Sequence, residues 1–337
     1  MTELSFFTRL LDDVSPSDRF RLALEQIEHA EAHGYGRAWV AQHHFRYVEG
    51  GLPSPFVFLS HAAARVPRIR LATGIVTLTL EDPIRVAEDA VVADLLSGGR
   101  IDLGIGSGAR PESFVPFGLD GANKGTDYAA KLDRLHAALG GDDLGAENHL
   151  YPGGEGIRSR IWQATFSHYG GTSAGENGNA LLLSKSQPRT PELADASLAD
   201  IQLPIIAAYR AALAGGAAPR ITASRAVFVA DTTAEALAFA EAGLERLREF
   251  AERSGKKLDL SSPESIAATS DTFVGDPDDI SRLLAADETL REVDEVAVQV
   301  HSVDPPHEHI MRSLELVATE VAPRLGWATG ARSVPVH

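Results

Sequence analysis

Short apolar runs alternate with amphipathic segments along the first half of the chain. Four runs rich in β-branched and aromatic residues predict strands at Leu4–Thr8, Ala38–Ala41, Ile69–Leu80 and Arg100–Ile105. These strands begin about 32 residues apart, a spacing typical of one strand-and-helix unit that repeats. We therefore expect each interval to hold a helix that covers the sheet.

Two of these intervals carry clear helix signals. In the first, apolar positions recur on one helical face from residue 20 to residue 30, so we expect Ser17 to cap the helix and Gly34 to follow its end. In the third, Pro83 suits the first turn of a helix, and Ser97-Gly98-Gly99 suits its end. The pattern predicts strand and helix in strict alternation.

The second half keeps this alternation with a less regular spacing. Eight strand-then-helix steps without a composition break favour a (β/α)8 barrel, one domain over residues 1–337, rather than two doubly wound domains. The long irregular stretches, Gly140–Gly156 and Leu258–Ser270, are expected to be lids or substrate walls. The predicted strands are Ile161–Phe166, Ala180–Ser184, Ser224–Ala230 and Glu295–His301, and the predicted helices are 127–139, a short one after Gly171, 192–213, 234–254 and 310–322.

Charge and composition narrow the function. The net charge is −16, which disfavours nucleic acid and anionic membranes as partners and favours a small-molecule substrate. The chain has no cysteine, which excludes disulfides, thiolate metal sites and a cysteine nucleophile. The N-terminal segment has acidic residues where a signal peptide needs basic ones, and its apolar run is too short to cross a bilayer. We expect a cytoplasmic enzyme that binds no metal.

The active sites of barrels lie at the carboxyl ends of the strands, where four clusters stand out. The first is Gln42-His43-His44-Phe45. Neighbouring residues at a strand end point to opposite sides, so at most one of the two histidines looks into the barrel mouth. A neutral imidazole there suits acid–base chemistry or hydrogen bonding to a cofactor. The alternative is that one histidine packs in the core and the other caps a loop.

Two clusters contain glycines where a flat ligand could approach the backbone. Gly74 and Ile75 lie inside an otherwise β-branched run, where a glycine indicates a bulge, a close approach of a ligand, or simply a barrel bend. The run Gly104-Ile105-Gly106-Ser107-Gly108-Ala109 is similar to a dinucleotide fingerprint, but Pro111 follows closely and three similar units precede it. We interpret it as a glycine-lined wall rather than a Rossmann turn.

The fourth cluster, Ser167-His168-Tyr169-Gly170-Gly171-Thr172-Ser173, leads from a predicted strand into a short helix. Hydroxyl groups and free backbone N–H groups at a helix start form an anion site, and on barrels the usual anion is phosphate. The alternative is a plain Ser/Thr helix cap with a flexible glycine lead. Two glycines and three hydroxyls within one turn favour the phosphate site.

Beyond these local patterns, the ordered blocks of the sequence resemble the bacterial luciferase family of flavin-dependent monooxygenases. The runs that carry the resemblance are AEAHGYGRAWVAQHHF, IRLATGIVTLTLEDPIRVAEDAVVADLLSGGRIDLGIGSG, ESFVPFG, ATFSHYGGTSAGENGNALLLSKSQPR, FVGDPDDI and SLELVATEVAPRL. They cover nearly the whole chain. The resemblance implies a barrel that binds FMN or a deazaflavin at its carboxyl-terminal mouth.

The resemblance also implies roles for individual residues. His43 corresponds to the family's histidine linked to proton transfer at the flavin, and Gly74-Ile75 to the strand that often has a cis peptide beneath the isoalloxazine. Gly106, Ser107 and Arg110 fall near the ring and phosphate. The turn that binds the flavin phosphate corresponds to Ser167, Tyr169, Gly170 and Gly171. Arg85, Glu88 and Asp94 are similar to a family motif that we interpret as a buried ion-pair and cap network.

One departure separates this chain from luciferase itself. A reactive cysteine of luciferase is replaced here by Gly106, and an arginine that follows it is replaced by Ser107. Light emission is therefore not expected, whereas the wider oxygenase chemistry does not require that thiol.

We interpret the chain as a two-component monooxygenase that takes reduced FMN from a separate flavin reductase, uses dioxygen, and oxidises a small, aldehyde-like or similar organic substrate in a mostly hydrophobic pocket. By analogy we expect a homodimer. Two alternatives stay open: a deazaflavin-dependent oxidoreductase that transfers hydride, and a non-catalytic flavin-binding subunit.

Overall fold

Within the residues that the computed structural model describes (1–45, 50–108, 110–243, 257–259, 261–301, 303 and 305–330), eight parallel strand positions close into a barrel. The hydrogen-bonded order is β10-β1-β2-β3-β5-β6-β7-β8, and β10 pairs with β8 to close the ring. This confirms the predicted (β/α)8 barrel. The strands are β1 (Glu3–Thr8), β2 (Arg37–Val40), β3 (Arg70–Thr73), β4 (Val76–Thr77), β5 (Ile101–Gly106), β6 (Ile161–Ala164), β7 (Ala180–Leu183), β8 (Ile221–Val229), β9 (Thr272–Gly275) and β10 (Glu295–Gln299).

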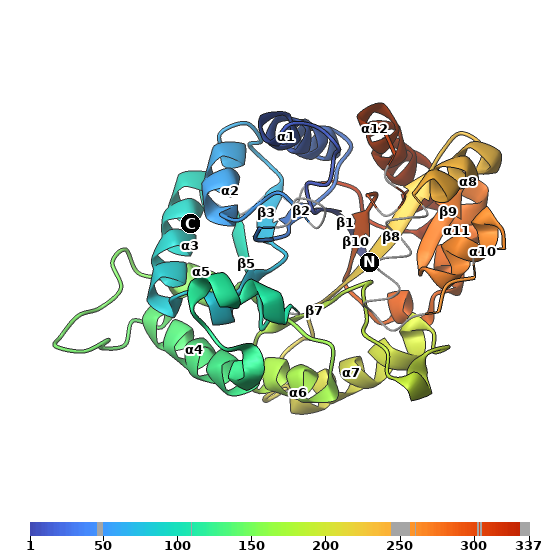
Figure 1. The fold of residues 1–337 in the computed structure, drawn as a ribbon. Coiled ribbons are helices and arrows are strands. Elements are labelled where there is room, and N and C mark those ends of the chain that lie inside the picture. The colour runs from blue at the N-terminus through green and yellow to red at the C-terminus, as the bar shows by residue number, and fades with distance from the viewer. Residues whose placement is uncertain are drawn as a thin grey trace.

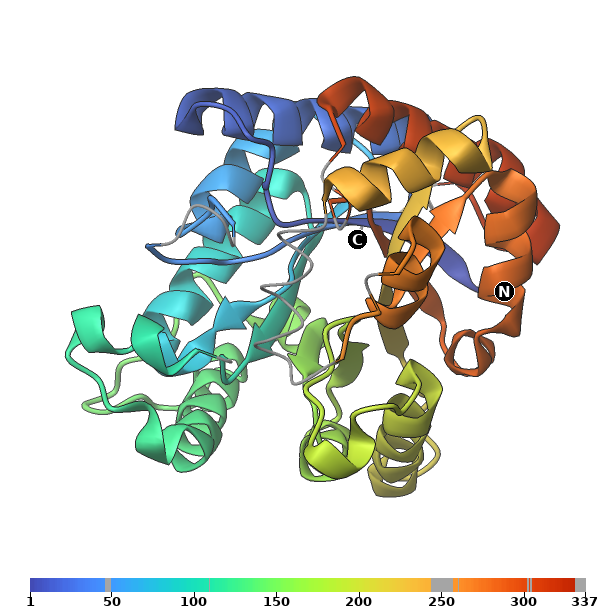
Figure 2. The same ribbon diagram turned by 45° about the vertical axis from the view of Figure 1, so that its right-hand side comes forward.

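Helices form the outer layer and follow one another around the strands (Figures 1 and 2). None of the helices in the described part of the chain is both long and apolar enough to pass through a bilayer. They are α1 (Pro16–Ala32), α2 (Pro55–Ala63), α3 (Pro83–Ser97), α4 (Lys124–Leu139), α5 (Glu155–Arg158), α6 (His168–Glu176), α7 (Leu198–Ala212), α8 (Thr233–Ala242), α10 (Pro263–Thr269), α11 (Pro277–Ala286), α12 (His307–Leu316) and α13 (Ala322–Leu325).

The core has two layers because side chains alternate between the two faces of each strand. The larger layer lies between the strands and the helices. The smaller one fills the barrel interior, where the two indole rings of Trp39 and Trp162 meet edge to face at 5.4 Å. The other buried members of this interior cluster are Ala72, Ala180, Leu182 and Ala297.

The strand predicted over Ile69–Leu80 is interrupted. It forms β3, then the cis peptide bond Gly74–Ile75, then β4 and a 3-10 turn over Leu78–Leu80. Gly74 stands where a β-carbon would lie 2.7 Å from Cε2 of Phe7, so a side chain here would collide with β1. The prediction placed the strand correctly, and Gly74, which suggested a bulge, lies at a full break.

Other boundaries also differ from the prediction. The cap of α1 is Ser15, whose hydroxyl accepts a hydrogen bond from the Asp18 N–H, and not Ser17. The helix predicted over 192–213 begins at Leu198, and α6 begins before Gly171 rather than after it. Part of the helix predicted over 234–254 lies outside the described residues. The stretch Leu258–Ser270 contains α10, and β9 and α11 follow it without having been predicted.

Candidate active site

The floor of the candidate site is apolar. Phe7 of β1, Ile75 and Ala164 of β6 are partly exposed, and all three pack on the interior cluster around the two indole rings. A β-carbon on Gly106 would lie 3.2 Å from Cδ1 of Ile75 and 3.6 Å from Cβ of Ala164. The glycine at the end of β5 therefore keeps a flat stretch of backbone between two apolar side chains.

Hydrogen bonds hold the interrupted strand against β5. The Thr73 hydroxyl donates to the Gly104 carbonyl at 2.7 Å and accepts from the Gly104 N–H at 2.9 Å. The peptide bond that follows, Gly74–Ile75, is cis, as the resemblance implied. Beyond it, the Thr77 N–H donates to the Gln42 side chain at 2.7 Å. The floor is thus fixed by contacts between three neighbouring strands.

His43 follows β2 and lies in a basic environment. Its backbone N–H donates to the Leu52 carbonyl at 2.9 Å, and a β-carbon on Gly50 would approach Cδ2 of the imidazole to 2.6 Å. Burial lowers the pKa of His43 well below its ordinary value, and the positive charges of Arg9 and Arg110 lower it further. The imidazole is therefore neutral at neutral pH.

His44, the next residue, belongs to a different surface. Its ring meets Phe117 edge to face at 5.1 Å and lies 5.6 Å from the ring of Phe45, and these two phenyl rings are also 5.6 Å apart. Phe45 is 66% exposed and has a backbone φ of 68°. The three rings form an aromatic rim between the segments that follow β2 and β5, which agrees with the expectation that the two histidines face different ways.

The helix α6 begins directly after β6 and is capped by Ser167. The Ser167 hydroxyl accepts a hydrogen bond from the Gly170 N–H at 3.2 Å, and Ser167 itself is exposed. Tyr169 is 80% exposed. Because the first N–H groups of a helix have no partner within it, this start of α6 presents hydrogen-bond donors to an anion.

Two glycines of α6 have packing roles of their own. A β-carbon on Gly170 would collide with the hydroxyl of Thr165, and one on Gly171 would lie 2.7 Å from the Ile205 carbonyl oxygen of α7. One turn later, a β-carbon on Gly175 would lie 2.9 Å from Cβ of Ala212. Gly171 and Gly175 let α6 approach α7 closely, and Gly170 lets the start of α6 approach Thr165, whether or not an anion binds.

The predicted residues thus fall into two groups at one end of the barrel. Gly74, Ile75 and Gly106 lie at the apolar floor, whereas His43 follows β2 and is acted on by the charge of Arg110. Ser107 follows Gly106, and its carbonyl accepts from the Thr79 hydroxyl at 3.0 Å. The second group is Ser167, Tyr169, Gly170 and Gly171, after β6. The two groups are neighbours in the barrel because β5 pairs with β6.

The sequence analysis missed Phe7, Arg9, Phe117 and Ala164. Arg9 is the first residue after β1, so a search of every strand end for charged side chains would have found it. The floor residues have no comparable signal, because apolar residues in strands are common.

One interpretation was wrong. Arg85 and Glu88 are not buried: Arg85 has 65% of its side chain exposed and pairs with Glu88 and Asp89 on the surface of α3. Only Asp94 fits the expected role. It is largely buried, pairs with Arg160 at 2.7 Å and accepts the Ile101 N–H at 3.0 Å.

Comparison with known proteins agrees with this architecture. The model of the luciferase-like monooxygenase family matches residues 3–293, and the chain therefore belongs to that family. It is similar to 4-hydroxyprotoasukamycin monooxygenase of Streptomyces nodosus subsp. asukaensis, with 41% identity over 120 residues, 36% of this chain and 32% of that protein. It is also similar to the oxygenase component of the flavin-dependent trigonelline monooxygenase of Acinetobacter baylyi, with 30% identity over 137 residues, 40% of this chain and 38% of that protein. These matches span about a third of the length of the curated relatives.

Solved structures share the fold over almost the full length. The oxygenating constituent of 3,6-diketocamphane monooxygenase from the CAM plasmid of Pseudomonas putida, a type II Baeyer–Villiger monooxygenase in complex with FMN, has a TM-score of 0.76 at 20% identity and covers 98% of this chain and 100% of its own. The coenzyme F420-dependent tetrahydromethanopterin reductase of Methanopyrus kandleri has a TM-score of 0.66 at 20% identity, with coverages of 96% and 100%.

Proposed function

We propose that this chain is the oxygenase of a two-component monooxygenase that uses reduced FMN and dioxygen to oxidise a small, aldehyde-like or similar organic substrate. The observation that carries the proposal is the combination, at one end of the barrel, of an apolar floor with basic groups and a helix start. FMN has the matching parts: a flat ring system and an anionic phosphate. The solved FMN complex of the same fold supports this choice of cofactor.

The residues divide the work by their chemistry. The start of α6 binds the phosphate through its backbone N–H groups and the Ser167 hydroxyl, and the floor of Phe7, Ile75 and Ala164 supports the ring and excludes water. When bound, reduced FMN supplies the electrons and the reactivity toward dioxygen. Neutral His43 would take up or deliver the proton that the reaction requires, at Nδ1 or Nε2.

The aromatic rim favours an apolar substrate. Phe45 is 66% and Phe117 42% exposed, and their ring centroids lie 5.6 Å apart. Aromatic side chains offer large apolar contact areas with little loss of side-chain freedom. The rim thus supports the proposal of a substrate with an apolar part.

Two partners belong to this proposal. A separate flavin reductase delivers reduced FMN, as the name of the trigonelline relative, an oxygenase component, indicates for that protein. The oxygenase itself is a homodimer.

The choice of cofactor is tested first, and the activity is tested second. Titration of the purified chain with FMN and with the deazaflavin F420, followed by fluorescence, should show tighter binding of FMN. Addition of a flavin reductase, nicotinamide nucleotide and dioxygen should then give oxygenated product from a panel of aldehydes, sulfonates and amines. Exclusive F420 binding would favour the hydride-transferring alternative, which the likeness to the F420-dependent reductase supports. FMN binding without any product would favour the non-catalytic subunit.

A further inference from the structure

Four ionisable side chains stand in a row between the end of β10 and the outer surface of α1. His301 follows β10, Asp12 precedes α1, and His307 begins α12. Nε2 of His301 lies 3.5 Å from Oδ2 of Asp12, whose Oδ1 lies 3.8 Å from Nδ1 of His307. Nε2 of His307 lies 3.3 Å from Oε2 of Glu25 on α1. Each group is therefore within ion-pair distance of the next.

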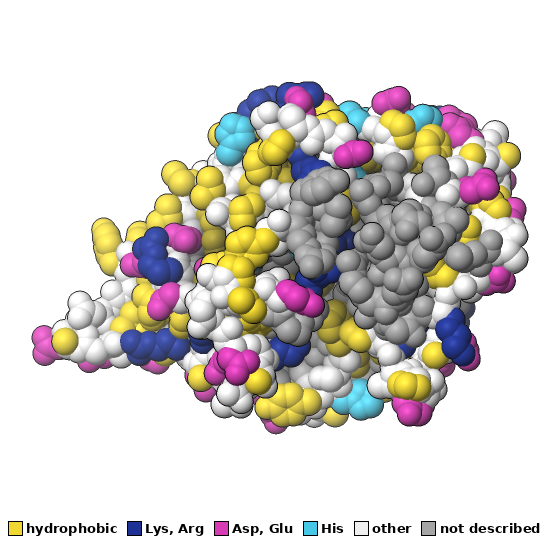
Figure 3. All heavy atoms as spheres, viewed as in Figure 1, with side chains coloured by type: hydrophobic (Ala, Val, Ile, Leu, Met, Phe, Trp, Pro, Cys, Tyr) yellow, Lys and Arg dark blue, Asp and Glu magenta, His cyan; other side chains and the backbone are white. Residues whose placement is uncertain are grey.

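The exposure of these side chains rises steadily along the row. The exposed fraction of the side chain is 1% for His301, 4% for Asp12, 23% for His307 and 39% for Glu25. Figure 1 shows α1 and α12 side by side on the outside of the barrel, and Figure 3 shows histidine side chains at the surface there. The row thus begins at a buried histidine and ends at a carboxylate in solvent.

The buried end of the row falls on the inner face of the barrel wall. Side chains of a strand alternate between its two faces, and Ala297 of β10 belongs to the interior cluster. His301, four residues later, falls on the same face. Because Phe6 of β1 pairs with Val298, the floor residue Phe7 is level with residue 299. His301 therefore stands two residues beyond the floor, roughly 7 Å farther along the wall toward the mouth.

We propose that His301, Asp12, His307 and Glu25 form a pathway that carries protons from solvent to the candidate active site. We name it the His301 pathway. The inference rests on the proposed oxygenase function and adds a proton route that does not involve His43. Reduction of one atom of dioxygen to water takes two electrons from the reduced cofactor and two protons, and the protons that the cofactor does not bring come from solvent. A site that excludes water needs a route for them.

Each step of the pathway moves one proton between neighbouring groups. Glu25 takes a proton from solvent and passes it to Nε2 of His307, whose Nδ1–H then donates to Asp12. The carboxylic acid so formed donates to Nε2 of His301, and Nδ1 of that ring releases a proton toward the site. An imidazole can accept at one nitrogen and release from the other, and exchange of its tautomers restores the starting state. No oxidation or reduction takes place along the pathway.

A buried amide holds the middle of the pathway together. Gln26 donates from Nε2 to both carboxylate oxygens of Asp12 at 3.2 Å, and the same nitrogen lies 3.3 Å from Nδ1 of His307. The gap of 3.8 Å between Asp12 and His307 exceeds hydrogen-bond distance by about 0.6 Å. A small rotation of the imidazole closes it, and hydrogen bonds of this kind commonly tighten when the substrate binds.

The charged groups around the pathway leave His307 as its entry. Arg19 of α1 donates from Nε to the backbone carbonyl of Asp12 at 2.9 Å and so fixes the loop before α1. Burial lowers the pKa of His29 on the same helix, and the positive charges of His33 and His307 lower it further, against the opposing charge of Glu315 on α12. His29 therefore does not compete with His307 for protons from solvent.

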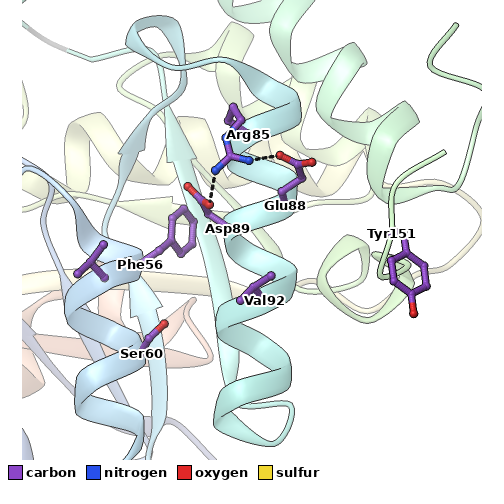
Figure 4. Close-up of a pocket in the computed structure, with 8 residues that line it drawn as sticks. Phe56, Ser60, Arg85, Glu88, Asp89, Val92 and Tyr151 are labelled. Atoms are coloured by element: carbon purple, nitrogen blue, oxygen red, sulfur yellow. Dashed lines mark hydrogen bonds and ion pairs between the residues drawn. The ribbon is translucent and has the colours of Figure 1, made fainter. Parts of the chain in front are cut away.

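Two other charged clusters of the described residues lack this gradient of exposure. Arg85 and Asp89 of α3 lie 3.1 Å apart with 65% and 49% of their side chains exposed, as Figure 4 shows for the pair. Arg37 and Asp102 lie 2.9 Å apart with 11% and 2% exposed. The first cluster stays at the surface and the second stays inside, whereas the His301 pathway joins the two environments.

The first test measures proton exchange in the chain without cofactor. With ¹⁵N-labelled histidine, NMR gives the rate at which the Nε2–H of His301 exchanges with water, and His301→Gln assigns the signal. His307→Gln and Asp12→Asn should each slow this exchange about tenfold or more, because a positioned group accelerates proton transfer by at least that factor. His309→Gln is the matched control. His309 lies on the same helix with 31% of its side chain exposed, and its Nδ1 is 3.4 Å from Oε1 of Glu235. Exchange should stay unchanged in this control.

The second test measures turnover with flavin reductase, FMN and dioxygen. His307→Ala should lower turnover about tenfold or more, while FMN affinity and KM stay within about twofold. Imidazole added to the buffer should restore turnover, because a small base can occupy the partly exposed position of the missing ring. A purely structural defect would not respond to imidazole. His309→Ala should show neither the loss nor the restoration.

Far-UV circular dichroism identifies a variant that fails to fold, and the partly exposed His307 then serves as the test position in place of Asp12. Exchange at His301 that is equally fast in the wild type and in His307→Gln would overturn the pathway. Equal slowing in His309→Gln would overturn it too, and so would a turnover loss that imidazole leaves unchanged. If the wild type forms no product while exchange at His301 still depends on His307, the proposed function fails and the proton route stands.

Discussion

Replacement of Ser167 by alanine tests the phosphate site most directly. The Ser167 hydroxyl is the cap of α6 and accepts the Gly170 N–H at 3.2 Å. In the proposed complex the same hydroxyl, at an exposed helix start, also donates to the flavin phosphate. The substitution removes both bonds and leaves the backbone N–H groups in place. Because the side chain is exposed, alanine creates no cavity and no collision.

The expected loss of folding stability is smaller than the expected loss of FMN affinity. Removing a serine cap costs about 1 kcal/mol of folding free energy. A hydrogen bond to a charged group contributes about 1.5–3 kcal/mol, so the FMN dissociation constant should rise roughly 10- to 100-fold. The stability loss is far too small to account for such a change, since the folded state would remain almost fully populated.

Ser197→Ala is the matched control. Ser197 caps α7 in the same way, accepting the Asp200 N–H at 3.1 Å, and is also exposed. Urea unfolding should show similar stability losses for the two variants, whereas FMN titration should show weakened binding for Ser167→Ala alone. Equal FMN affinity in both variants would refute the phosphate assignment, and selective weakening in Ser197→Ala would move the phosphate to α7.

Three further predictions concern other groups. His43→Gln should lower turnover strongly while FMN affinity stays within about twofold; unchanged turnover would remove His43 from the mechanism. Burial lowers the pKa of His136 to about 4, so acidification from pH 6.5 to 4 should cost about 3 kcal/mol of stability as the unfolded chain alone takes up the proton. His136→Gln should flatten this part of the pH dependence of the free energy of unfolding, measured with urea. An unaltered pH dependence would show that the protonation of His136 is not its cause. Phe117→Ala should raise KM for apolar substrates with little effect on FMN binding, whereas Phe20→Ala, on α1, should leave KM unchanged. Equal KM shifts in the two variants would argue against contact between the substrate and the aromatic rim.

The barrel was predictable because its signals are local. Each strand is a short apolar run, and helices such as α1 and α3 have their own cap and apolar stripe, so the alternation of elements could be recognised without knowing any contact. Gly74 suggested a bulge and the family resemblance a cis peptide, but the complete break of the third strand could not be derived from the local pattern. It depends on Gly74 meeting Phe7, which lies 67 positions earlier in the sequence, and such a contact exists only after the barrel has closed.

Some signals were present and were not used. Asp276 and Pro277 form a regular helix start, and Asp276 accepts the N–H groups of Asp278 and Asp279. The choice of Ser17 over Ser15 as a cap likewise ignored Pro16, which suits the first helical position and places the cap just before it. These errors concern boundaries and small elements outside the barrel ring.

The candidate site was predictable in part. Searching the strand ends found His43 and the start of α6, because polar and glycine residues are unusual there. The same search treated Gly170 and Gly171 as a phosphate loop, whereas the structure gives both a packing reason as well. An aspartate at Gly171 would collide with the Ile205 carbonyl before any charge repulsion with a phosphate could be measured. For this reason Ser167, and not either glycine, is the informative position.

The electrostatics of the chain explain why local groups must select the cofactor. A net charge of −16 repels an anionic cofactor at long range. In salt at physiological strength, however, charges are screened beyond about 8 Å, so only groups close to the site act on a bound anion. The site holds such groups: Arg9 and Arg110 lower the pKa of His43, and α6 presents its N-terminus. Burial lowers the pKa of His43, and these positive charges lower it further, so the basic groups that favour a bound anion also favour the neutral imidazole that the proposed chemistry uses.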